Sequence, residues 1–242
     1  HSSYSDGANT LEEMIAACAA RGYAYHAISD HSQYKARGGG LTPDAARAQR
    51  EHVHSLGDRF GIRTFCASEV DICPDGSLVF DDTVLAEFDV VIASVHTGTN
   101  ASREEMTRRI IAACENPFVS ILGHPTGRYV DAYSEFGGYE FDYDAVFAAA
   151  ARTGTALEID GHLARLDLPS ALARRAKSFG VTFTCDSDAH SVEALGNVSY
   201  AVGQARRAWL EPSDVLNTRS AADVLTFVAR KRASAALPAN KH

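Results

Sequence analysis

Six short apolar runs, separated by segments with helical periodicity, constrain the fold of this 242-residue chain more than any other feature. The runs cover residues 24–29, 63–69, 90–95, 118–122, 155–159 and 181–185. Repeated alternation of strand and helix builds a parallel sheet, either as a closed barrel or as a doubly wound layer. The chain is therefore predicted to adopt an α/β fold.

The helical segments between these runs have recognisable starts. Thr10-Leu-Glu-Glu is a capping-box pattern that precedes apolar residues at helical spacing, and Ser102-Arg-Glu-Glu repeats it. Pro43, directly after a threonine, is typical of a first helical position. Further helical patterns cover residues 143–152, 170–179 and 221–232.

Ionisable side chains stand at or beside the ends of nearly all the predicted strands. They are Asp30, His31, Glu69, Asp71, His96, His124, Glu158, Asp160, Asp186, Asp188 and His190. In α/β folds the chemistry collects beyond the carboxyl ends of the strands. Side chains donated by consecutive strands converge most simply in a barrel, because a doubly wound sheet would use only the strands near its switch point.

A crowd of imidazoles and carboxylates at one barrel mouth is costly unless something positive organises it. Any single histidine is ordinarily a hydrogen-bonded structural residue, but four at strand ends, together with Glu69 and Asp188, weaken that interpretation. Imidazole and carboxylate together suit zinc, manganese or iron. A multinuclear site of this kind suits phosphate esters, because neighbouring metals clamp the attacking and leaving oxygens.

Composition narrows the remaining alternatives. The apolar content of 45% is enough for one substantial core, and no linker divides the chain, so one domain over residues 1–242 is expected. The net charge of −8 argues against tight, autonomous binding of nucleic acid through a basic face. The sequence shows no membrane-spanning run and no signal peptide, and its five cysteines lack metal-site pairing, so a cytoplasmic location is predicted.

Motifs along the chain resemble, in order, those of the PHP (polymerase and histidinol phosphatase) domain family. They are His1-Ser-Ser-Tyr-Ser-Asp6-Gly7, Ile28-Ser-Asp30-His31-Ser32, Ala67-Ser-Glu69-Val-Asp71, Ser94-Val-His96, Gly123-His124-Pro125 and Asp186-Ser-Asp188-Ala-His190. Within the family, the chain is most similar to the C-terminal PHP domain of bacterial family X DNA polymerases. The stretches that carry this likeness are 116–118, 124–128, 157–161, 165–169, 207–209 and 215–218.

The resemblance implies a distorted (βα)7 TIM-like barrel with two or three divalent metal ions, manganese or zinc, with iron as an alternative. By position it implies three overlapping ligand sets: His1, Glu69 and Asp188; Glu69, His96 and His124; Asp6, His31 and His190. It also implies that the metals activate the attacking water, so that no separate protein base is required. The residues expected to carry catalysis are Glu69, Asp188, His190 and Arg128.

Three basic residues are candidates for holding a substrate phosphate, each beside a simpler interpretation. Arg128 suits bidentate phosphate binding or is a surface arginine. Lys35 precedes a glycine-rich stretch that either covers the substrate or is a plain loop. Arg165 is either a phosphate ligand or an ion-pair partner at the barrel mouth. His162 and Asp186 match no ligand position and are expected to orient ligands.

The family's first motif normally begins with a histidine two residues before His1, which the printed sequence does not include. We therefore expect the first barrel strand to be missing from this chain, and the first metal set to be the weakest. The same resemblance leads us to expect that the chain is a fragment of a larger polymerase.

The predicted function is a metal-dependent phosphoesterase that hydrolyses DNA phosphodiesters. It would act as a 3′–5′ exonuclease and 3′-end processing domain in DNA repair, with a polymerase domain in the same polypeptide and no membrane partner. One alternative is a small-molecule phosphatase of the histidinol-phosphatase type. A second alternative is a non-catalytic interaction domain stabilised by metal, which the intact ligand positions disfavour.

Overall fold

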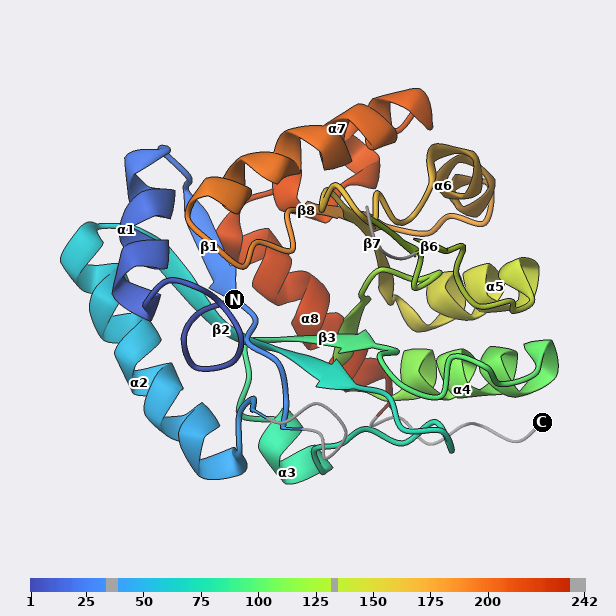
Figure 1. Ribbon diagram of the computed structural model, residues 1–242, viewed down its shortest axis with the longest axis horizontal. Helices are drawn as coiled ribbons and strands as arrows, with labels where there is room; N and C mark the ends of the chain where they lie inside the picture. The colour runs from blue at the N-terminus through green and yellow to red at the C-terminus, as the bar shows by residue number, and fades with distance from the viewer. Residues whose placement is uncertain (34–38, 132–134, 236–242) are drawn as a thin grey trace.

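A six-stranded parallel sheet forms the centre of the computed structural model, which describes residues 1–33, 39–131 and 135–235. Its strands are β1 (Tyr25–Ile28), β2 (Arg63–Asp71), β3 (Val90–Ser94), β4 (Val119–Leu122), β7 (Ala156–Asp160) and β8 (Phe183–Asp186). They lie in the sheet in chain order, without a reversal, and the sheet curls as part of a barrel (Figure 1). The α/β prediction is confirmed, and the doubly wound alternative is wrong.

Helices surround this sheet on several sides. They are α1 (Leu11–Ala20), α2 (Pro43–Phe60), α3 (Asp82–Leu85), α4 (Arg103–Glu115), α5 (Tyr143–Thr153), α6 (Ser170–Lys177), α7 (Val198–Arg207) and α8 (Ala221–Ala235). Figure 1 shows α1 and α2 on one side, α4 and α5 on the other, and α6 and α7 along a third. Short 3-10 helices cover Glu193–Asn197, Pro212–Asp214 and Leu216–Thr218. A small antiparallel pair, β5 (Tyr129–Val130) and β6 (Glu135–Phe136), follows β4.

The two faces of the sheet pack against different parts of the protein. Along β2, side chains alternate between faces, so that Phe65, Ala67 and Glu69 share one of them. Phe65 and Ala67 pack in an apolar cluster with Val224 and Val228 of α8, which passes behind the strands in Figure 1. Apolar packing thus fills the amino-terminal part of this face, and its carboxyl-terminal part carries Glu69. The opposite face packs against the surrounding helices in a larger core.

The edge strands β1 and β8 each have one neighbouring strand in the sheet. A cavity of about 650 Å³ is lined by residues of both, among them Tyr25 and Thr184. Asn217 satisfies part of the open edge of β8, because its side chain accepts from the Cys185 N–H at 3.1 Å and donates to the Cys185 carbonyl at 2.7 Å. In the described part of the chain no further strand lies between β1 and β8. The additional first strand implied by the family resemblance therefore stays a prediction.

Helix α4 connects the fold to the strand ends. Its buried Arg109 donates to the Thr97 carbonyl at 2.8 Å and to the Ile72 carbonyl. These two carbonyls belong to the loops that follow β3 and β2, so one guanidinium holds both loops in place.

Across residues 1–33, 39–131 and 135–235, no helix has the length and apolar character needed to span a membrane.

The capping box of α4 gives a test of the local sequence signal. The Ser102 hydroxyl accepts from the Glu105 N–H at 3.3 Å, and the Glu105 carboxylate accepts from the Ser102 N–H at 2.9 Å. We expect Ser102→Ala to lower the free energy of unfolding by about 1 kcal/mol, because an N–H of the first turn loses its acceptor. Urea denaturation measures this. Ser102→Asp, which keeps an acceptor, should retain most of the stability, and equal loss in both variants would contradict the capping argument.

Candidate metal centre

The eight predicted metal ligands lie together at the carboxyl ends of the strands. Glu69 is part of β2, and the loops that follow β1, β3, β4 and β8 supply five more, namely His31, His96, His124, Asp188 and His190. The remaining two, His1 and Asp6, come from the segment before α1. Strand β7 supplies none of the eight, although it ends at the same edge.

Glu69 stands at the middle of this group, with its side chain almost fully buried. Its Oε1 lies 2.8 Å from His124 Nε2 and 3.0 Å from His96 Nε2. Its Oε2 lies 3.3 Å from His1 Nε2 and 3.3 Å from His31 Nδ1. One carboxylate therefore faces four imidazoles, with each oxygen shared between two of them.

Three overlapping groups place their ligand atoms within 4.8 Å of one another: His1, Glu69 and Asp188; His31, Glu69 and His96; His1, Asp6, His31 and His190. The first coincides with the first predicted set. The third contains the third predicted set and adds His1. The second pairs Glu69 and His96 with His31 in place of His124, although His124 also contacts Glu69.

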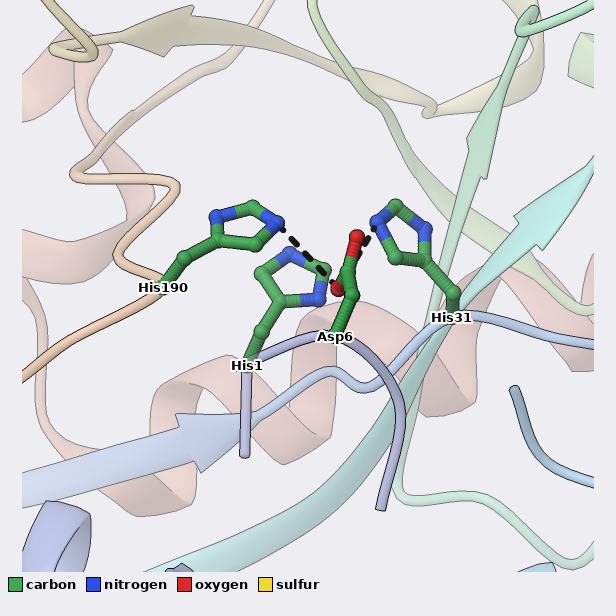
Figure 2. A group of neighbouring side chains, drawn as sticks. All are labelled: His1, Asp6, His31 and His190. Atoms are coloured by element: carbon green, nitrogen blue, oxygen red, sulfur yellow. Dashed lines mark ion pairs between the residues drawn. The ribbon is translucent and has the colours of Figure 1, made fainter. Parts of the chain in front are cut away.

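Figure 2 shows the group that faces outward. Asp6 Oδ1 lies 3.6 Å from His31 Nε2 and 3.4 Å from His190 Nε2, so the carboxylate stands between the two rings. The His1 ring stacks on His190, with centroids 4.1 Å apart. Because 53% of the Asp6 side chain and 34% of the His190 side chain are exposed, this is the solvent-accessible side of the cluster.

The protonation preferences of the cluster differ from one histidine to the next. Burial would raise the pKa of Glu69, but the surrounding imidazoles, with His31 and His96 foremost, hold it well below its usual value. Burial lowers the pKa of His31 to about 4 and also lowers that of His124, which favours neutral rings. Neighbouring carboxylates outweigh burial at the other three ligand histidines: they raise the pKa of His96 to about 8 and also raise the pKa of His1 and His190. Ionised carboxylate beside neutral imidazole is the donor set that zinc and manganese take, so binding of such an ion would displace protons from His1, His96 and His190.

The orientation of His96 supports the same interpretation. Its Nδ1 lies 2.8 Å from Asp71 Oδ1, and the Ser32 hydroxyl donates to Asp71 Oδ2 at 3.1 Å. The buried Nε2 of His96 points toward Glu69 and makes no hydrogen bond within the described part of the structure. A carboxylate that holds one ring nitrogen and leaves the other for a ligand is a usual companion of metal-binding histidine. The sequence placed Asp71 in a motif but assigned it no role.

Asp30 organises the segment that carries His1 and Asp6. Its Oδ1 accepts from the Ser2 N–H at 2.7 Å and the Ser5 hydroxyl at 2.5 Å, and its Oδ2 accepts from the Ser2 hydroxyl and from the Gln49 amide. All four partners are donors to one fully buried carboxylate. The only signal for this role in the sequence is that Asp30 stands directly before His31 in the same motif.

The backbone close to the ligands is constrained. His124 and Asp188 have positive φ values of 23° and 46°, a region that residues other than glycine rarely adopt. Gly7 follows Asp6 where the chain turns back on itself, and a Cβ there would lie 2.6 Å from the His1 carbonyl group. Only glycine allows this close approach, which brings Asp6 and His1 to the same site.

Acidic residues at the ends of β7 and β8 form a layer beside the ligands. Glu158 accepts from the His124 N–H, and Asp160 accepts from the His162 N–H at 2.6 Å. Burial, reinforced by neighbouring carboxylates, raises the pKa of both Glu158 and Asp160 well above the usual values. Burial also raises the pKa of Asp186 to about 6.

The predicted phosphate-binding residues have different surroundings. Arg165 Nε lies 3.6 Å from Asp160 Oδ2 and 3.5 Å from Asp188 Oδ2, an arrangement that favours the ion-pair interpretation. Arg128 donates to the Arg165 carbonyl, so it braces the loop that carries Arg165. Lys35 lies outside the described residues.

A sequence model of the PHP domain matches residues 1–162 of the chain. This chain belongs to the PHP domain family. Together with the ligand cluster, membership supports a metal-dependent phosphoesterase as the class of this PHP domain. The resemblance to family motifs in the sequence is confirmed.

Relatives of this PHP domain include both polymerases and phosphatases. The "DNA polymerase/3'-5' exonuclease PolX" of Bacillus subtilis (strain 168) is 42% identical over 231 residues, which are 95% of this chain but 40% of that protein. The chain thus spans less than half of that relative. A "Probable phosphatase" of Syntrophotalea carbinolica is 28% identical over 220 residues, 86% of this chain and 85% of that protein.

A solved structure shares the fold of this PHP domain. Histidinol phosphate phosphatase from Lactococcus lactis, in complex with zinc, L-histidinol and phosphate, matches with a TM-score of 0.58 at 17% identity. The match covers 87% of this chain and 92% of that one. It confirms the distorted TIM-like barrel as the fold class.

Replacing Asp71 tests how much the orientation of His96 contributes. We expect Asp71→Ala to weaken Mn²⁺ binding by about 10- to 100-fold, because the ring loses the carboxylate that directs its Nε2 toward Glu69. Calorimetric titration of the metal-free protein measures the affinity. Asp75→Ala, at an exposed turn, is the matched control and should bind as the wild type. Wild-type affinity in Asp71→Ala would show that Asp71 serves packing alone.

Replacing Asp30 tests the anchor of the N-terminal segment. Asp30→Asn keeps the shape but turns one acceptor oxygen into a donor that faces donors. We expect faster hydrogen exchange over residues 1–10 and a lower metal content, because His1 and Asp6 lose their fixed positions. Mass spectrometry and elemental analysis measure the two effects, with the exposed Asp58→Asn as control. Unchanged exchange over residues 1–10 would contradict this role of Asp30.

Proposed function

We propose that this PHP domain hydrolyses DNA phosphodiesters as a 3′–5′ exonuclease that also processes 3′ ends during repair, in a polypeptide that also carries a polymerase domain. The observation that carries the proposal is Glu69, whose two oxygens face different imidazole pairs within three overlapping ligand groups. The 42% identical relative, named as a polymerase and 3′-5′ exonuclease, supports DNA as the substrate.

The chain's own residues define how the centre would act. Bound Mn²⁺ or Zn²⁺ ions, two or three in number, would supply Lewis acidity to the phosphoryl group and lower the pKa of the attacking water. Glu69 would hold such ions with both of its oxygens, since Oε1 lies 3.0 Å from His96 Nε2 and Oε2 lies 3.3 Å from His1 Nε2. We propose Glu69, Asp188 and His190 among these ligands, together with Arg128, as the residues that carry catalysis.

The basic residues beside the centre complete the proposal. We propose Arg128 and Arg165, together with Lys35, as the groups that face the substrate phosphates. Arg165 stands 3.5 Å from Asp188, close enough for its guanidinium to neutralise charge at the cluster. With a net charge of −8, the chain gains little from nonspecific attraction to DNA, which fits a division of labour in which another domain grips the duplex.

A small-molecule phosphatase is the second candidate. It is favoured by the fold neighbour from Lactococcus lactis, a histidinol phosphate phosphatase, and by the Syntrophotalea relative that matches over 85% of its length. Both are matched along most of their chains, whereas the polymerase is matched over 40% of its length. The identity of the polymerase relative is higher, which is why we place the exonuclease first.

A direct comparison of substrates distinguishes these functions. Protein loaded with Mn²⁺ is incubated with a 5′-labelled single-stranded oligonucleotide, the same strand with a 3′-phosphate, and L-histidinol phosphate. We expect stepwise shortening from the 3′ end and removal of the 3′-phosphate. Fast phosphate release from L-histidinol phosphate with intact oligonucleotides would favour the phosphatase, and fewer than two metals per chain without hydrolysis would favour a non-catalytic interaction domain.

The central carboxylate gives the matched variant for this assay. We expect Glu69→Gln to lower kcat/KM on the preferred substrate by more than about 100-fold, since loss of a direct ligand costs more than loss of a group that orients one. Metal content should fall in parallel. Glu104→Gln, at an exposed position on α4, should leave both quantities unchanged. Retention of activity in Glu69→Gln would remove Glu69 from the centre of the mechanism.

A further inference from the structure

A small ledge of ring and apolar side chains lies beside the metal centre, on β5, which follows β4, and on the loop that follows β7. It consists of Tyr129, His162 and Leu163. The Tyr129 and His162 rings are nearly parallel, with centroids 6.2 Å apart and an angle of 24° between their planes. The ledge is half-buried at the two rings and open at Leu163, whose exposed fraction is 58%.

Arg165 connects this ledge to a predicted metal ligand. Its Nε lies 3.5 Å from Asp188 Oδ2, and its Cζ lies 5.4 Å from the centre of the Tyr129 ring. The ledge is therefore separated from the metal cluster by one guanidinium group. A phosphate bound beside Asp188 would thus lie one guanidinium group away from the Tyr129 ring.

The ledge is held rigidly by contacts between its two loops. The Val130 N–H donates to the Ala164 carbonyl at 2.7 Å, and the Asp167 carboxylate accepts from the Thr126 N–H at 3.0 Å. Within the second loop, the Arg165 N–H donates to the His162 carbonyl at 2.8 Å. A surface fixed in this way loses little conformational entropy when a ligand packs on it.

The position of Leu163 distinguishes it from other exposed apolar side chains. Phe179, Tyr200, Val202 and Trp209 also have large exposed fractions, but all lie on or directly after α6 and α7. A single exposed leucine is ordinary on any protein. Here it follows His162 directly in the chain, beside a ring pair that Arg165 connects to Asp188, and that combination is what points to a ligand.

The chemistry of the ledge indicates what it would hold. Burial lowers the pKa of His162, so its ring is neutral near pH 7 and adds no charge to the surface. Neutral rings and an aliphatic side chain favour a flat, uncharged, partly apolar group. A nucleobase has these properties, and stacking on an aromatic ring tolerates all four bases.

We propose that Tyr129, His162 and Leu163 hold the base of the terminal nucleotide while its phosphodiester lies at the metal centre. The proposal rests on the nuclease function proposed above and extends it. The ledge would bind the base of the nucleotide that is released, and this contact would make the enzyme prefer nucleotides over simpler esters. The ledge residues are specificity residues and leave the chemical step to the cluster.

Paired substrates test the ledge. Kinetics are measured on an oligonucleotide with a normal 3′-terminal nucleotide and on the same strand ending in an abasic sugar. Tyr129→Ala and Leu163→Ala should each raise KM for the first substrate by about 10-fold, with kcat changed less than about twofold. KM for the abasic strand should stay within about twofold, and Tyr129→Phe should behave as the wild type. Tyr200→Ala, an exposed aromatic on α7, is the matched control.

A binding measurement separates the ledge from the nuclease activity. Calorimetry on the wild type compares dAMP with deoxyribose 5-phosphate, and we expect dAMP to bind at least about 10-fold more tightly, a preference that Tyr129→Ala removes. Equal binding of the two ligands, or equal losses on both oligonucleotides, would overturn the ledge proposal. A preference for dAMP without cleavage of any oligonucleotide would keep the ledge and reject the exonuclease.

Discussion

The structure depends on one buried carboxylate that faces four imidazoles. An isolated carboxylate charge at the buried position of Glu69 would be strongly destabilising. The four surrounding imidazoles offset this cost only when some of them are protonated or when they and Glu69 bind cations. The sheet is built to deliver this arrangement. β2 is the longest strand, extending from Arg63 to Asp71, and it carries Phe65 in the apolar cluster and Glu69 at the polar end of the same face. Apolar packing and the metal centre therefore share one row of side chains.

A second layer of carboxylates holds the ligands in place. Asp30 fixes the segment of His1 through four donors, Asp71 directs His96, and Glu158 accepts from the His124 backbone. Acidic residues near a metal site are easily mistaken for ligands. Here their partners show that they position the first layer, which explains why the strand ends carry more acidic residues than the metals would use.

Much of this arrangement follows from the sequence, and the exceptions have physical causes. All six predicted strands are present within two residues at each end, because buried strands have strong apolar patterns. Helix α7 was not predicted, since its buried face consists of small residues such as Ala201 and Ala205, which give a weak periodic signal. Motif order predicted eight residues that the structure brings together, and the grouping differs from the predicted one mainly at His31. This ring lies with Glu69 and His96 because β1 and β3 are the two neighbours of β2 in the sheet. The ion pairs of Arg165 likewise depend on loop geometry that no local pattern encodes.

The amino-terminal end of the sheet is packed with apolar side chains, and its carboxyl-terminal end carries the candidate metal ligands. This division also explains how substrate choice can differ within one fold. α8 and the apolar cluster occupy the amino-terminal part of the face that bears Glu69, so the stability of the core makes few demands on the loops at the other end. The loops after β4 and β7 are joined to each other through Val130 and Ala164, and they contact the cluster through His124 of the first loop and Arg165 of the second. Changes at Tyr129 or Leu163 would therefore alter which organic group is accepted without disturbing the metal ligands. Under this proposal the cluster would define the reaction and the two neighbouring loops the substrate, an arrangement compatible with relatives that carry polymerase and phosphatase names.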